Sequence, residues 1–204
     1  MQRILIKINS QSLGDTVAAL PYINKFQAVN PNNKVYVNIV QLLVPYFESV
    51  YPALTFSANG SAEAFDRIIE LEYNFNVPIQ LGYADQLGFS NAPYIRPAIL
   101  KPAGDRPIKN KYVALGIHST SQLKYWNHPS GKRVQSAAPY WNELCILLRK
   151  AGYTPVVVEK YELFGVGPHW NGLPAKANKK FGQDLANSIN LIYHSDFYIG
   201  LSSG

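Results

Sequence analysis

The feature that most constrains the fold is a repeated alternation of short apolar strands with helices along the whole chain. Residues 3–9 are rich in β-branched side chains, as in a strand, and residues 15–29 carry apolar side chains at three-residue spacing, as in a helix. Further strands are predicted at 34–40, 65–71, 112–117, 154–158 and 197–201. Further helices are predicted at 42–51, 79–87, 139–151 and 181–194. This order predicts an α/β fold with a parallel sheet and helices on both faces.

A change in composition near the middle of the chain indicates two domains. Residues 97–110 combine three prolines and a glycine with charged side chains, which is typical of a linker or a long crossing loop. We therefore expect a Rossmann-like domain at 1–107 and a second one at 111–204. The second series has fewer elements than a complete doubly wound domain and stops after a strand, so we expect it to be incomplete.

The charge of the chain is concentrated in its second half. The net charge is +6, of which +1 comes from residues 1–110 and +5 from residues 111–204. A basic half indicates an anionic partner. No run of Lys or Arg exceeds a pair and no nucleic-acid-binding motif is present, so a small phosphorylated ligand is favoured over nucleic acid.

Other global features narrow the class of protein further. No apolar run reaches the ~18–20 residues that a membrane span needs, and the first residues do not form a secretory signal. Cys145 is the one cysteine among 204 residues, which excludes a disulfide framework and a multi-cysteine metal site. We therefore expect a cytoplasmic protein.

The first motif that could carry chemistry is Ser12-Leu13-Gly14-Asp15, which directly follows the first strand. Ligands of open α/β sheets bind at the carboxyl ends of strands, where Gly14 would allow a sharp turn and a close approach of a ligand. Asp15 would face the cleft at a helix start as a carboxylate able to accept a proton from a hydroxyl. The alternative is a plain helix cap. The second and third glycines of a dinucleotide fingerprint are absent, which argues against NAD.

Three more motifs follow strands of the second series. Ser119, Thr120 and Lys124 carry hydroxyls and an ammonium suited to a diphosphate, or they form a polar loop. Glu159 follows the next strand and could bind ribose hydroxyls, or it is a solvated turn charge. The sequence ends with Ser202, Ser203 and Gly204, whose backbone N–H groups could form the first part of an anion-binding site.

Taken in order, these motifs resemble the bacterial heptosyltransferases, and most closely those that modify autotransporters. The resemblance rests on SLGDTVAALPYINKF at 12–26, GIHSTSQLKYWNHP at 116–129 and GLSSG at 200–204. It implies the two-domain glycosyltransferase-B architecture. It also implies a nucleotide-sugar donor, usually ADP-heptose, bound mainly by the second domain, and transfer to a glycan or protein hydroxyl with inversion.

The resemblance also assigns roles to individual residues. Asp15 matches the general base of the family, and Gly14 adjoins it on the acceptor side. The positions that match donor-binding residues are Ser119, Thr120, Lys124, Glu159, Ser202, Ser203 and Gly204. Lipopolysaccharide-type members usually carry Asp where Ser202 stands, whereas the autotransporter type tolerates serine there.

We expect no metal and no cofactor, because the iron-containing autotransporter type uses several cysteines and this chain has Cys145 alone. A homo-oligomer is compatible with the resemblance. Two other hypotheses stay open. One is a non-catalytic remnant of the fold that keeps nucleotide or sugar binding, and the other is a nucleotide-binding interaction protein.

Overall fold

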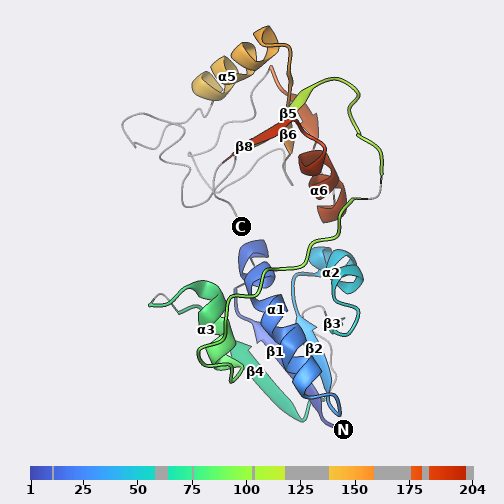
Figure 1. The fold of residues 1–204 in the computed structure, drawn as a ribbon, viewed down its shortest axis with the longest axis vertical. Helices are drawn as coiled ribbons and strands as arrows, with labels where there is room; N and C mark the ends of the chain where they lie inside the picture. Colours follow the sequence, from blue (N-terminus) through green and yellow to red (C-terminus); the bar gives the residue numbers. More distant parts are fainter. Residues whose placement is uncertain are drawn as a thin grey trace. The chain divides into compact units, whose positions relative to one another are not determined.

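The computed structural model describes residues 1–10, 12–57, 64–74, 76–102, 104–117, 138–158, 176–180 and 184–200. The chain divides into two compact units, residues 1–101 and residues 102–203. Each unit contains a four-stranded parallel sheet with helices packed on it (Figure 1). The predicted α/β class is therefore confirmed.

The sheet of the first unit has the strand order β3-β2-β1-β4. Its strands are β1 (Arg3–Ile8), β2 (Lys34–Asn38), β3 (Thr55–Ser57) and β4 (Arg67–Leu71). The helical elements are α1 (Leu13–Val29), η1 (Gln41–Leu43), α2 (Val44–Val50) and α3 (Ile79–Gln86). Because β1 is the first strand and lies between β2 and β4, the chain reverses its direction of growth across the sheet at β1.

Helix α1 is buried on more than one side, because it packs on β1 and also beside α3. Tyr22 and Ile23 are fully buried within it. The sequence predicts that Pro21 bends the helix or delays its start, yet α1 begins at Leu13 and continues through Pro21 to Val29. The expected later start is wrong, because the Ser12 cap and the burial of successive turns outweigh the hydrogen bond that proline removes.

The sheet of the second unit has the order β7-β6-β5-β8, the same order relative to the chain as in the first unit. Its strands are β5 (Tyr112–Gly116), β6 (Thr154–Val158), β7 (Asn178–Lys180) and β8 (Phe197–Gly200). Its described helices are α5 (Ala138–Lys150) and α6 (Leu185–Tyr193). Gly152 ends the predicted helix with a left-handed φ of 85°, as a glycine after a helix commonly does.

Alternating side chains of β5 pack against different helices. Val113 and Leu115 join Trp141 and Cys145 of α5 in one hydrophobic cluster. Tyr112 lies on the opposite face, where its hydroxyl donates to the carbonyl oxygen of Leu191 in α6 at 2.7 Å. Cys145 is a small buried core residue, and burial raises the pKa of its thiol to about 11.

An aspartate fixes the edge strand in each unit. In the first unit the backbone N–H of Arg3 donates to the Asp66 carboxylate at 2.6 Å, and the N–H of Asp66 donates to the Arg3 carbonyl at 2.9 Å. In the second unit Tyr112 and Asp196 make the same pair of bonds, at 2.8 and 2.9 Å. These two aspartate brackets, Asp66 with Arg3 and Asp196 with Tyr112, hold β4 and β8 in register with the first strand of their unit.

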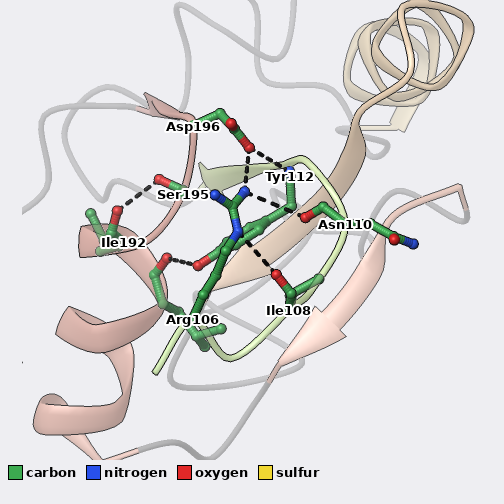
Figure 2. Close-up of polar contacts among 8 residues, drawn as sticks. Arg106, Ile108, Asn110, Tyr112, Ile192, Ser195 and Asp196 are labelled. Atoms are coloured by element: carbon green, nitrogen blue, oxygen red, sulfur yellow. Dashed lines mark hydrogen bonds and ion pairs between the residues drawn. The ribbon is translucent and has the colours of Figure 1, made fainter. Parts of the chain in front are cut away.

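The second bracket includes Arg106, as Figure 2 shows. Its guanidinium binds Asp196 at 2.5 Å, donates to the carbonyl oxygen of Ile108 and lies over the Tyr112 ring. The N–H of Tyr112 and, more weakly, Arg106 lower the pKa of Asp196. The second part of the predicted linker is thus attached to the second unit.

Candidate functional site

The strand order identifies one edge of each sheet as the place for a ligand. In the first unit β1 lies between β2 and β4, so the strand order switches direction at β1. Open α/β sheets bind ligands beyond the carboxyl ends of the strands at such a switch point. Ser12 to Asp15 follow β1, and Tyr73 follows β4, at this edge.

Asp15 lies in the first turn of α1 and is bound to the capping residue of that helix. The Ser12 hydroxyl oxygen accepts from the Asp15 N–H at 3.2 Å and donates to Asp15 Oδ2 at 2.8 Å. Thr16 is fully buried in the next position and donates its hydroxyl to the Ser12 carbonyl oxygen at 2.9 Å. The arrangement therefore combines the predicted helix cap with a partly exposed carboxylate at the carboxyl edge of the sheet.

Gly14 lies in the same helical turn, between Leu13 and Asp15. It does not have the left-handed φ found at Gly88 and Gly152. The expected sharp turn at Gly14 is therefore wrong, because the turn after β1 is completed before the helix begins. The absence of a side chain still leaves its backbone open to close approach, and that role stays a prediction.

Tyr83 lies within electrostatic range of Asp15 and of Tyr73. Tyr83 of α3 is almost fully buried. Burial, followed by the charge of Asp15 and by Tyr73, raises the pKa of Tyr83 to about 12. Sequence analysis did not single out Tyr83, because its position in an apolar helix resembles that of the other packing tyrosines. The sequence signal that could have identified Tyr83 is its hydroxyl group, carried by the helix that follows β4, the strand next to β1.

The predicted donor-binding residues follow three neighbouring strands of the second sheet. Strands β6, β5 and β8 are adjacent and parallel, so their carboxyl ends meet at one edge. Glu159 directly follows β6. The other predicted positions come after β5 and β8. All seven predicted donor-binding residues lie outside the described residues: Ser119, Thr120, Lys124, Glu159, Ser202, Ser203 and Gly204. Their roles stay predictions. The strands that precede them, β6, β5 and β8, are neighbours in the sheet.

Tyr198 lies at this edge of the second sheet, close to two glycines. A Cβ atom added to Gly116 or to Gly200 would collide with the Tyr198 ring. Gly116 and Gly200 are partners in the pairing of β5 with β8, at the carboxyl ends of both strands. The glycine pair therefore makes room for an aromatic ring that is 44% exposed beside the predicted donor site. This contact was not predicted, because it joins strands distant in the sequence.

Within the part of the chain that the structure describes, no group of three or more His, Cys, Asp or Glu side chains could hold a metal ion. No helix in the described ranges is long and apolar enough to cross a membrane.

Curated relatives match nearly the whole chain. The chain is 26% identical over 214 residues to the autotransporter heptosyltransferase BAHTCr of Citrobacter rodentium, covering 98% of this chain and 50% of that protein. It is 27% identical to the autotransporter heptosyltransferase TibC of Escherichia coli, with the same coverage. The chain thus spans about half the length of the curated relatives it matches. No family model matches the chain.

Solved structures show similarity to the same kind of protein. The crystal structure of TibC, described as an iron-containing dodecameric glycosyltransferase, matches 100% of this chain and 54% of its own at 26% identity and a TM-score of 0.79. The lipopolysaccharide heptosyltransferase II of E. coli matches at a TM-score of 0.65 and 13% identity, covering 100% of this chain and 80% of its own. The two units have the Rossmann-like folds of the glycosyltransferase-B architecture, as the resemblance implied.

The comparison with TibC overturns one expectation. We expected no cofactor, but TibC is described as iron-containing, so the absence of a metal does not follow from this resemblance. The described residues offer no cluster that fits an iron ion, and Cys145 is a buried core thiol. We therefore assign no iron ligand to this chain and derive no chemical step through iron. In its sequence and in its fold, the chain is similar to bacterial heptosyltransferases.

Proposed function

We propose that the chain provides the acceptor side and part of the donor side of a glycosyltransferase that moves heptose from ADP-heptose to an acceptor hydroxyl. The observation that carries this proposal is the match of 98% of the chain to autotransporter heptosyltransferases. A second structure of TibC is described as a complex with ADP-D-β-D-heptose, and it matches this chain at 25% identity and a TM-score of 0.78.

In the proposed reaction Asp15 acts as the general base. Its carboxylate accepts the proton of the acceptor hydroxyl while the hydroxyl oxygen attacks the anomeric carbon of the donor. The bond from that carbon to the diphosphate oxygen breaks, and ADP leaves with the electron pair. Attack from the face opposite the diphosphate inverts the anomeric centre. The position of Asp15 at the carboxyl edge of the first sheet supports this role.

The second unit would bind the donor. Lys124 and the hydroxyls of Ser119 and Thr120 would stabilise the negative charge that grows on the leaving diphosphate. Glu159 would bind the ribose, and the segment that begins at Ser202 would bind the diphosphate through backbone N–H groups. The excess of basic residues in 111–204 and the adjacency of β6, β5 and β8 support this division.

The proposed acceptor is a hydroxyl on an autotransporter protein, since the relatives are named for that substrate class. A cytoplasmic location and assembly into a homo-oligomer are part of the proposal, the second supported by the description of TibC as dodecameric.

Two measurements on the purified chain test the proposal. Calorimetry measures binding of ADP and of ADP-heptose. Release of ADP, together with a mass increase of one heptose on a purified unmodified autotransporter passenger, measures transfer. Transfer by the wild type and its loss in Asp15→Asn are expected. Binding without transfer would instead identify a non-catalytic remnant of the fold, and failure to bind either nucleotide would contradict the assignment of the donor site.

A further inference from the structure

The hydroxyl of Tyr83 is a buried donor for which no hydrogen-bond acceptor is found among the described residues. The side chain is 1% exposed and lies in α3, which packs beside α1 (Figure 1). Tyr22, a buried tyrosine of α1, differs in that its hydroxyl donates to the carbonyl oxygen of Pro93 at 2.8 Å. A buried hydroxyl without a partner destabilises the fold, and such groups are rare in native proteins unless function uses them.

The charged and titratable groups that act on Tyr83 are Asp15 from α1 and Tyr73 from the segment before α3. Burial is the largest influence and keeps the phenol protonated throughout the pH range of an enzyme assay. The hydroxyl is therefore a hydrogen-bond donor at working pH, and the carboxylate of Asp15 is an anion whose charge acts on it.

Asp15 offers the complementary acceptor. Its Oδ2 atom accepts the Ser12 hydroxyl at 2.8 Å, whereas no described residue donates to Oδ1. A carboxylate has room for about four hydrogen bonds. While Asp15 remains bound to the helix cap, its Oδ2 atom accepts from Ser12, and the Tyr83 hydroxyl has no acceptor among the residues that the structure describes.

We propose that Tyr83 is a positioning residue for Asp15, whose hydroxyl donates to the Asp15 carboxylate when that side chain turns from Ser12 toward the acceptor. This inference rests on the proposed function of Asp15 as the base. The two residues then form a pair in which α3 holds the carboxylate that α1 carries. The exchange of donors, Ser12 for Tyr83, would fix the orientation of the base during proton transfer.

Tyr83→Phe removes the hydroxyl and keeps the ring. We expect kcat for ADP release to fall about tenfold, because hydrogen bonds to charged groups are among the stronger ones. The KM for ADP-heptose is expected to stay unchanged, since the donor binds to the second unit. Loss of a donor to a carboxylate favours its protonated form, so the acidic limb of the kcat profile moves to higher pH. The thermal midpoint is expected to stay the same or rise.

The matched control is Tyr46→Phe. Tyr46 is also buried in the first unit with its pKa raised by burial, but Asp15 does not contribute to that shift. This variant is expected to keep the wild-type kcat and pH profile. An active wild type with an unchanged Tyr83→Phe profile would overturn the inference and leave the proposed function standing.

A second measurement does not need turnover. In Ser12→Gly the cap geometry is largely kept while the competing hydroxyl is removed. Carbon NMR then follows the titration of the Asp15 carboxyl group in Ser12→Gly and in the double variant Ser12→Gly/Tyr83→Phe. A titration at higher pH in the double variant supports the hydrogen bond, and identical titrations overturn it. Absence of ADP release in the wild type would count against the proposed function alone.

Discussion

The two units have sheets of the same strand order, but they differ in the length of the connection that follows the first strand. Each orders its strands so that the first lies between the second and the fourth, and each fixes the fourth with an aspartate bracket. In the first unit only residues 9–12 separate β1 from α1, whereas residues 117–137 separate β5 from α5. A short connection places one carboxylate firmly at a helix start, and a long one supplies many polar groups. In our proposal, the same strand order therefore provides a base in the first unit and a ligand-binding segment in the second.

The strongest test of this comparison is to remove the base. Asp15→Asn keeps an oxygen that can accept from Ser12, so the helix cap should survive. General bases contribute roughly 100- to 10,000-fold to rate, and we expect a fall in kcat of about that size. ADP affinity measured by calorimetry should stay at the wild-type value, because our proposal assigns donor binding to the second unit. A weakened ADP affinity would contradict the separation of roles.

The reciprocal change is Lys124→Ala in the second unit. Loss of a charged contact to the diphosphate should weaken ADP binding about tenfold or more. Lys176→Ala is the matched control, since Lys176 is an exposed lysine of the same unit and its removal changes the net charge equally. Equal losses of ADP affinity in both variants would show that the affinity depends only on the net positive charge of the second unit.

A smaller effect separates tyrosines by their hydrogen bonds. Tyr22 and Tyr112 each donate to a backbone carbonyl, one in each unit. Tyr22→Phe and Tyr112→Phe should each lower the free energy of unfolding by about 1 kcal/mol. Tyr83→Phe should lower it by nothing measurable, since no described group accepts from that hydroxyl. Urea denaturation of the three variants measures the difference, and an equal loss in Tyr83→Phe would reveal a partner for its hydroxyl in the native state.

The smallest effect concerns pH and the bracket of the second unit. The pKa of Asp196 is lowered in the fold, first by the N–H of Tyr112 and then by Arg106. A lowered pKa stabilises the fold above the pKa of the unfolded chain, and this contribution disappears as the pH falls through the folded value. Asp196→Asn should therefore unfold more easily than the wild type at pH 7, and the difference should disappear in acid once the pH falls below the lowered pKa of Asp196. If the unfolding midpoints of the wild type and Asp196→Asn differed by the same amount at every pH, the loss of stability would come from altered hydrogen-bond geometry and not from the lost charge.

The sequence predicted the long elements well, because they carry enough residues to show a period. The helix at 13–29 and the strand at 112–116 are both recognisable from apolar spacing alone. Strands β3 and β7 were missed, since each has three residues at a sheet edge and three residues show no alternation. Of the two effects expected of Pro21, the later helix start is wrong, because tertiary burial of α1 outweighs the local preference of proline.

The candidate site was predictable only where it follows a strand locally. Asp15 was identified because it opens a helix directly after β1. Tyr83 and Tyr198 were not, since what distinguishes them is a contact between distant segments: α3 with α1 in one case, and β8 with β5 in the other. A single sequence shows periodicity along the chain and contains no signal for such pairings.

Because Asp15 is hydrogen-bonded to Ser12, its side chain has two separate requirements to meet, one structural and one chemical. The carboxylate completes a helix cap, which any short polar side chain can do, and in our proposal it also performs chemistry, which only an acid can do. A descendant that lost the reaction could therefore exchange Asp15 for Asn or Ser and still fold. A natural homologue with an intact Ser12 and a neutral residue at position 15 would be recognisable as a folded protein that has given up transfer.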